Sequence, residues 1–132
     1  MIGTTTAAHW AERYIGMPWT PQSNCWHFCA RVWSEVFGIA VPLVDIDGAD
    51  ARAARRAFAS SAEDAGWYLV KTPAEGDAVL MAQGARPCHV GIWLNLDGVL
   101  HCIEHSGVVF TPGTRLSEIG YRIFGIYRRG GQ

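Results

Sequence analysis

The chain has 132 residues, of which 49% are hydrophobic and 17% are charged, values typical of a compact soluble fold. This length suits one hydrophobic core, so we expect a single domain over residues 1–132. The formal net charge of −1 provides no strong field, and the composition therefore argues against nucleic acid or an anionic membrane as a partner.

The N-terminal residues lack the basic and apolar regions of a signal peptide, and no apolar run approaches the ~20 residues of a membrane-spanning helix. We therefore expect synthesis in the cytoplasm, where thiols stay reduced. The four cysteines are Cys25, Cys29, Cys88 and Cys102. None forms a C-x-x-C motif, so a redox dithiol is not predicted.

The spacing of apolar residues predicts two helices in the first third of the chain. A short one is expected over Ala7–Ile15 and a longer one over Cys25–Phe37, with Ser23 or Asn24 as its N-cap. A third, alanine-rich helix is predicted over Ala49–Ser60.

From residue 67 onward the hydrophobic period changes to two, which predicts antiparallel strands. The expected strands are Trp67–Lys71, Ala78–Ala82, Cys88–Leu94, Val99–Glu104, Val108–Thr111 and Tyr121–Arg128, with a helical turn at Leu116–Ile119. The tail from Arg128 to Gln132 is expected to fray. Helices followed by strands predict an α+β fold, with the helices packed on one side of a sheet.

Two residues suggest catalysis. Cys25 lies at a predicted helix N-terminus, where the helix dipole lowers the pKa of a thiol from about 8.5. His89 opens a strand that is otherwise apolar, and its imidazole could stabilise the attacking thiolate. The backbone N–H of Cys25 would then face a developing oxyanion. Buried cysteines at apolar helix positions are also common and inert, so Cys25 could instead be a core thiol.

The remaining cysteines and His27 have structural interpretations. Cys29 lies a full turn inside the helix, and Cys88 and Cys102 alternate out of phase with the histidines of their strands. We therefore predict three core thiols. His27 points away from Cys25, because two residues along a helix correspond to a rotation of ~200°, and is expected at the surface or in helix packing.

Four blocks, in order, resemble the NlpC-like cell-wall cysteine peptidases, and the phage-tail branch is the most similar. They are the helix from Asn24 to Ile39, with an exit at Pro42; Pro73–Leu80, similar to a Pro-x-x-Gly-Asp strand entry; the histidine strand His89–Leu94; and Val99–Cys102. They lie within residues 14–105, about two thirds of the chain.

The resemblance implies a papain-like α+β fold with Cys25 as nucleophile, His89 as base and His101 as the orienting residue. It also implies hydrolysis of the peptide stems of bacterial peptidoglycan, as an endopeptidase or an amidase, without a cofactor. Association with a phage tail or a prophage, with other tail proteins as partners, would bring such an enzyme to the cell wall.

Hairpin geometry does not decide whether His101 or His105 is the third catalytic residue, the one that orients His89. A three-residue turn over 96–98, with Gly98 left-handed, would pair His89 with His105. A turn centred on Asn95 would instead place His101 opposite His89.

Two residues near Cys25 are candidates for substrate binding. Asn24 stands where many family members have aspartate, and Trp19 could stack on a substrate or pack within its loop. His27 replaces a glycine that is common in the family.

Two alternatives compete with the enzyme. The first is a zinc site drawn from Cys25, Cys29, His89, His101, Cys102 and His105, although these do not form the close pairs of tetrahedral sites. The second is a phage tail assembly protein that retains the fold without turnover.

Overall fold

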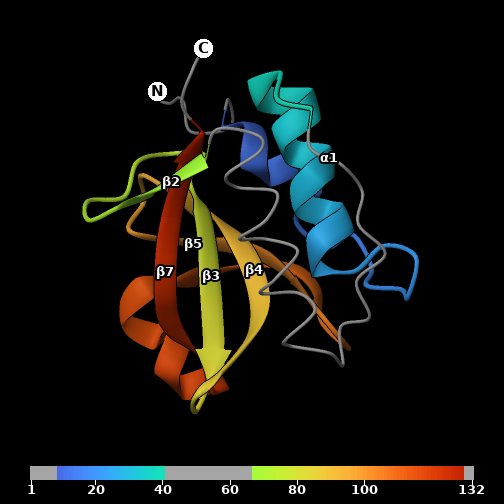
Figure 1. Ribbon diagram of the computed structural model, residues 1–132. Coiled ribbons are helices and arrows are strands. Elements are labelled where there is room, and N and C mark those ends of the chain that lie inside the picture. The colour runs from blue at the N-terminus through green and yellow to red at the C-terminus, as the bar shows by residue number, and fades with distance from the viewer. Residues whose placement is uncertain (1–8, 41–66, 130–132) are drawn as a thin grey trace, which may run out of the picture.

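The computed structural model describes residues 9–40 and 67–129, which form an α+β fold (Figure 1). The elements are the 3-10 helix η2 (Trp10–Tyr14), α1 (Cys25–Phe37), β2 (Trp67–Val70), β3 (Ala78–Gln83), β4 (Arg86–Leu94), β5 (Gly98–Ile103), β6 (Gly107–Pro112), the 3-10 helix η3 (Gly113–Ile119) and β7 (Arg122–Arg129). The predicted helix Ala49–Ser60 lies outside the described residues. Within the described residues, no helix is both long enough and apolar enough to cross a membrane.

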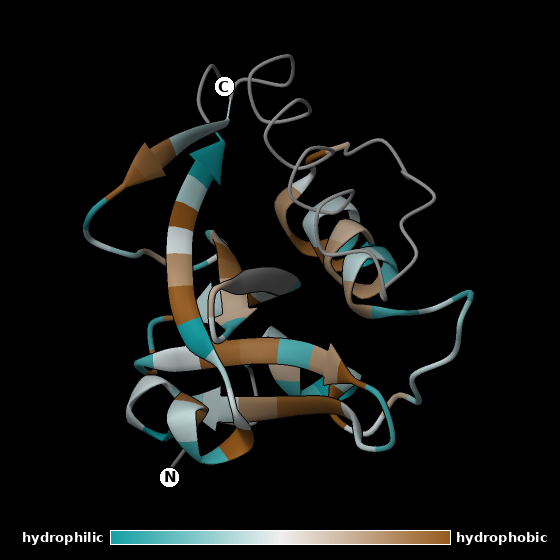
Figure 2. Ribbon diagram, turned by 60° about the horizontal axis from the view of Figure 1, so that its bottom comes forward, coloured by the Kyte–Doolittle hydropathy of each residue, from teal (hydrophilic) through white to brown (hydrophobic). Residues whose placement is uncertain are grey.

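The six strands form one antiparallel sheet in the order β2-β7-β3-β4-β5-β6. Each begins and ends within about two residues of its predicted bounds. The sheet curls, so that β5 lies behind β3 and β7 in this view and runs across their direction (Figure 1). In Figure 2, β7 carries hydrophobic residues in its middle and hydrophilic residues at both ends.

Helix α1 covers one face of the sheet, where it contacts β4 and β5. It ends at Gly38, whose φ of 67° is the left-handed conformation that glycine adopts without strain. The core between helix and sheet includes the buried residues Phe28, Cys29, Val32, Trp33, Val90, Ile92, Leu94, Leu100 and Cys102. This packing places the N-terminus of α1 over the strands that carry the two candidate catalytic histidines.

The described N-terminal helices, η2 and α1, pack on one side of the sheet, and the other face is covered by η3. Leu116 of η3 is buried in a second core with Val79, Met81 and Val99. The sequence contains the reason, because residues 78–82 of β3 are all apolar and all buried. A strand of this kind needs cover on both faces.

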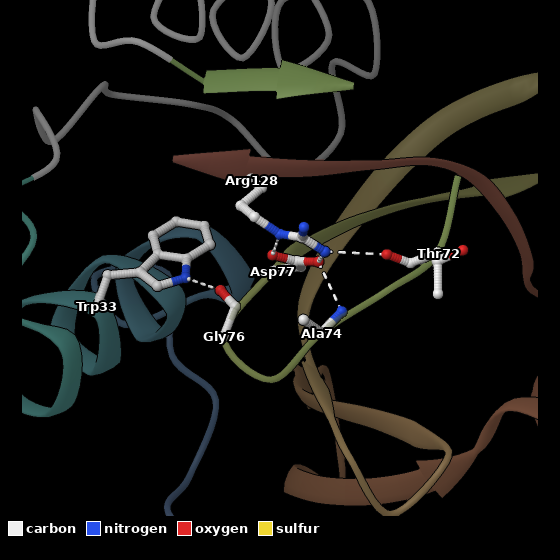
Figure 3. A network of polar contacts seen from close by, with 6 residues as sticks. All are labelled: Trp33, Thr72, Ala74, Gly76, Asp77 and Arg128. Carbon is white, nitrogen blue, oxygen red and sulfur yellow. Dashed lines mark hydrogen bonds and ion pairs between the residues drawn. The ribbon is translucent and has the colours of Figure 1, made fainter. Parts of the chain in front are cut away.

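An ion pair between the buried Asp77 and the half-buried Arg128 ties β7 to the start of β3 (Figure 3). Both Asp77 carboxylate oxygens accept hydrogen bonds from the Arg128 guanidinium, from Nε at 2.9 Å and from Nη2 at 2.8 Å. The same carboxylate accepts from the backbone N–H of Ala74 at 2.7 Å, and Arg128 also donates to the carbonyl of Thr72. The prediction of a frayed tail is therefore wrong for residues 128 and 129, which belong to β7. Residues 130–132 lie outside the described part of the chain.

Gly76, beside this ion pair, connects β3 to the helix. Its carbonyl accepts a hydrogen bond from Nε1 of Trp33 at 2.9 Å (Figure 3). Its φ is 94°, and a Cβ atom there would lie 2.8 Å from the Phe37 ring. The Gly76-Asp77 block thus has a structural function in this protein: it joins α1, β3 and β7.

Asp77→Asn should lower the free energy of unfolding by about 2 kcal/mol, because the charged hydrogen bonds of a buried carboxylate are lost. Urea denaturation measures this. The control is Glu118→Gln, which removes an exposed ion pair with Arg115 and should cost less than about 0.5 kcal/mol. Equal effects of the two substitutions would show that the Asp77–Arg128 pair does not stabilise the fold.

Candidate active site

Cys25 is the first residue of α1, and Asn24 is the N-cap of this helix. Oδ1 of Asn24 accepts hydrogen bonds from the backbone N–H groups of Trp26 at 3.0 Å and His27 at 3.2 Å. In return, Nδ1 of His27 accepts from the backbone N–H of Asn24 at 3.4 Å, which completes a capping box. The cap fixes the first turn, and with it the position of Cys25 at the positive end of the helix dipole.

Two thiol hydrogen bonds position Cys25 over β4 and β5. One turn after it, the Cys29 thiol donates to the carbonyl of Val90, at 3.7 Å. Two residues before it, the carbonyl of Ser23 accepts from the Cys102 thiol, at 3.8 Å. Val90 follows His89 in β4, and Cys102 follows His101 in β5. The first turn of α1 is therefore held against β4 and β5 at Val90 and Cys102, the residues that alternate with His89 and His101.

The neighbouring thiols differ from Cys25 in their exposure. Cys29 and Cys102 are buried, whereas Cys25 is half-buried. Burial, with a smaller contribution from the nearby Cys25, raises the pKa of Cys102 to about 11. Burial also raises the pKa of Cys29 well above its ordinary value. Both are core thiols that stay protonated at neutral pH, while the side chain of Cys88 lies outside what the structure describes.

The ladder between β4 and β5 is short, and the histidines lie just beyond its end. The last pair is Ile92 with Leu100. From there β4 stays paired with β3 through His89, and β5 stays paired with β6 through His101. Both histidines thus have a rigid backbone, although no backbone pairing links one histidine strand to the other at this point.

The two imidazoles are linked directly. Nε2 of His89 lies 2.9 Å from Nδ1 of His101, and Nε2 of His101 lies 2.9 Å from Oγ1 of Thr111. We call His89 and His101 the histidine pair. A Cβ atom at Gly91 would lie 3.0 Å from Cβ of His101 and 2.4 Å from Val99. The missing side chain at Gly91 therefore gives His101 room to reach His89.

Tyr121 packs against both members of the histidine pair. Its ring stacks on His89, with centroids 4.8 Å apart and an interplanar angle of 19°. It meets His101 edge to face, with centroids 6.3 Å apart. Tyr121 follows Gly120, which ends η3 in a left-handed conformation. Stacking of this kind restrains the plane of the His89 ring.

Both histidines are neutral at physiological pH. Burial, and to a smaller extent the neighbouring His101, lowers the pKa of His89 to about 3. Burial lowers the pKa of His101 to about 4. A neutral imidazole is the form that accepts a proton, so His89 is in the protonation state that a general base requires. Since Nε2 of His89 faces His101, its Nδ1 is the nitrogen left for a thiol.

The turn between β4 and β5 matches neither predicted register. Leu94 pairs with Gly98, so the turn comprises residues 95–97. Asp97, not Gly98, takes the left-handed conformation, with a φ of 59°. Gly98 is required within the strand instead, because a Cβ atom there would lie 2.4 Å from the Phe110 ring.

The two candidates for the third residue lie in different environments. His101 is fully buried and contacts His89. The side chain of His105 is 88% exposed, lies in the turn after β5, and pairs with Glu104 at 3.2 Å.

The predicted substrate-binding residues both have structural contacts. Asn24 is buried and acts as the helix cap, and Trp19 is half-buried and packs against the core beneath α1. Substrate binding by Asn24 or Trp19 stays a prediction. The histidine predicted at the surface or in helix packing, His27, is half-buried and completes the capping box.

No three histidine, cysteine, aspartate or glutamate side chains gather as a metal site within the described residues, which include all six proposed zinc ligands. The zinc alternative therefore has no cluster to support it there.

No model of a protein family matches the chain, and no curated protein matches it. Its function is therefore inferred from the residues of the site.

Sequence reasoning missed Thr111 and Tyr121. Thr111 is the polar residue at the end of an otherwise apolar run, Val108-Val109-Phe110, which is a weak signal for a buried partner. Tyr121 is distant from His89 in sequence, and only the return of β7 to the sheet brings it near.

The histidine pair should make stability fall as the pH falls. In the unfolded chain each histidine binds a proton below about pH 6.5, whereas the folded pKa values are about 3 and about 4. Between these limits the unfolded state holds more protons. The free energy of unfolding should therefore drop by on the order of 1 kcal/mol per pH unit for each histidine. Urea denaturation at a series of pH values tests this.

His105→Gln is the matched control, because this exposed side chain should leave the slope unchanged. His101→Asn should remove part of the slope. A wild type whose stability is flat from neutral pH to about pH 5 would contradict the burial of two neutral histidines.

Proposed function

We propose that the chain is a cysteine hydrolase of amide bonds, with Cys25 as nucleophile, His89 as general base and His101 as the orienting residue. One observation carries the proposal: two buried histidines are hydrogen-bonded to each other, and the strands that carry them pack against the capped helix that begins with the half-buried Cys25.

In the first half of the reaction, the Cys25 sulfur attacks the carbonyl carbon of the substrate, and its proton passes to Nδ1 of His89. The developing oxyanion faces the first turn of α1, where the backbone N–H of Cys25 and the helix dipole stabilise negative charge. The C–N bond then breaks, and His89 returns the proton to the departing amine. The product is a thioester on Cys25.

In the second half, a water molecule gives a proton to Nδ1 of His89 and attacks the thioester carbon. The C–S bond breaks, the carboxylic acid product leaves, and His89 returns the proton to the Cys25 sulfur. The neutral resting state of His89 suits both steps, because each begins with proton acceptance.

The finer assignment is a papain-like fold of the NlpC type acting on peptide stems of peptidoglycan. The four sequence blocks support it, since they correspond to α1, the entry of β3, β4 and β5. The packing of α1 on β4 and β5 also supports it. Endopeptidase and amidase activities both remain within the proposal, as does attachment to a phage tail.

The departures of this chain from the family pattern do not weaken the proposal. Asn24 and His27 form the capping box with each other, so these residues hold the first turn of α1 in place. His27 bonds to the backbone before Cys25, and its bulk is accommodated there.

Cys25→Ala and Cys25→Ser should abolish hydrolysis while the protein stays folded, because each removes the nucleophile at a half-buried position. Mass spectrometry of purified peptidoglycan fragments, incubated with wild type and variants, identifies the bond cleaved. Circular dichroism checks folding.

Identical, product-free spectra from folded wild type and variants would contradict hydrolysis of peptidoglycan. The tail assembly alternative would then be the better interpretation of the same fold.

His101→Ala should lower kcat by on the order of a hundredfold, because His89 loses the group that orients it. The matched control is His105→Ala, in the exposed turn that follows β5, which should retain wild-type activity. The opposite pattern would assign the orienting function to His105.

A further inference from the structure

Thr111 adds a third group to the hydrogen-bonded chain that begins with the histidine pair. Its hydroxyl lies 2.9 Å from Nε2 of His101, and the residue is half-buried in β6. β6 pairs with β5 throughout, with Thr111 opposite Val99, so the hydroxyl is held two residues along the ladder from His101. Val109 lies directly opposite His101. No step of the proposed reaction uses Thr111.

A neutral imidazole carries one proton, so one of its nitrogens donates while the other accepts. The three groups therefore allow only two proton arrangements. In the first, His89 donates from Nε2 to Nδ1 of His101, and His101 donates from Nε2 to Thr111. In the second, Thr111 donates to His101, His101 donates to His89, and Nδ1 of His89 carries the proton.

Only the first arrangement leaves a lone pair on Nδ1 of His89, the nitrogen that faces away from His101. The second arrangement blocks that nitrogen with hydrogen and removes the base. The choice between them depends on whether Oγ1 of Thr111 accepts or donates, because His101 is fully buried.

We propose that Thr111 is a positioning residue: its hydroxyl accepts the Nε2 proton of His101, and the resulting tautomers of His101 and His89 leave Nδ1 of His89 free to take the thiol proton. This inference rests on the proposed function, since it assigns Nδ1 of His89 as the base. It places four groups in one chain, from Cys25 through His89 and His101 to Thr111.

Tyr121 has a different and complementary effect. A stacked ring restrains the plane of the His89 imidazole, but it does not distinguish a ring from the same ring turned over. The hydrogen bond to His101 determines which edge of the His89 ring faces His101. The hydrogen bond to Thr111 determines the tautomer of His101, and through it that of His89. All three restraints are needed to present a lone pair in one direction.

Valine has nearly the shape of threonine and lacks the hydroxyl. In Thr111→Val, a proton on Nε2 of His101 would be buried without an acceptor, and orphaned buried N–H groups are costly. The proton should move to Nδ1, where it can bond to His89. His89 must then carry its own proton on Nδ1.

The test compares Thr111→Val with Thr111→Ser, which keeps the hydroxyl. Nitrogen-15 NMR of the imidazoles reports which nitrogens are protonated, independently of any activity. Wild type and Thr111→Ser should show Nε2 protonated in both His89 and His101, whereas Thr111→Val should show Nδ1 protonated in both. Wild-type protein with Nδ1 of His89 protonated, or Thr111→Val with unchanged tautomers, would overturn the proposal.

The second readout is the rate at which iodoacetamide alkylates Cys25 near neutral pH, followed by mass spectrometry of the Cys25 peptide. Thr111→Val should slow alkylation by on the order of a hundredfold, and Thr111→Ser should stay within about threefold of wild type. Equal rates for valine and serine would overturn the proposal. If the tautomers are as proposed but wild type and Cys25→Ala are equally inactive on peptidoglycan, the proposed hydrolase function fails and the tautomer assignment stands.

Discussion

The early end of the β4–β5 ladder, at the pair of Ile92 with Leu100, is the constraint on which the site depends. His89 and His101 alternate in phase with Trp93 and Val99, toward the second core and Tyr121, whereas α1 packs on the opposite face. The proposed proton transfer from Cys25 to His89 therefore requires the region where backbone pairing between β4 and β5 has stopped. The Cys29 thiol bonds to the carbonyl of Val90 in this same region.

Strands that lose their mutual pairing need support from elsewhere. β4 retains β3 and β5 retains β6, so each histidine strand keeps one complete ladder. The Asp77–Arg128 ion pair then fixes β3 to β7, and the bond from Trp33 to Gly76 fixes α1 to the start of β3. The site is thus a local interruption in a sheet that is secured on both sides.

The sequence predicts the parts of this arrangement that depend on local pattern. Apolar residues, alternating in most strands and continuous in β3, mark the sheet, and Asn24 followed by an apolar stripe marks the start of α1. The site residues that the sequence does not predict depend on the pairing register of neighbouring strands, and short turns determine this register. Asp97 adopts the left-handed conformation, and Gly98 lies in β5, where a side chain would clash with Phe110. The register of the β4–β5 hairpin therefore differs from both predicted pairings. Thr111 meets His101 across the β5–β6 hairpin, so its contact depends on the hairpin register. Tyr121 and Arg128 are brought to their partners by chain segments distant in sequence, and single-residue patterns carry little information on such contacts.

The position of β7 has a consequence for how the chain folds. β7 comes last among the described elements, yet it lies between β2 and β3 in the sheet. Until residues 122–129 arrive, β3 is an edge strand with unpaired backbone groups, and its apolar residues are a template for intermolecular pairing. During synthesis the chain must therefore pass through a state with an exposed apolar edge, and non-local pairing of this kind closes slowly.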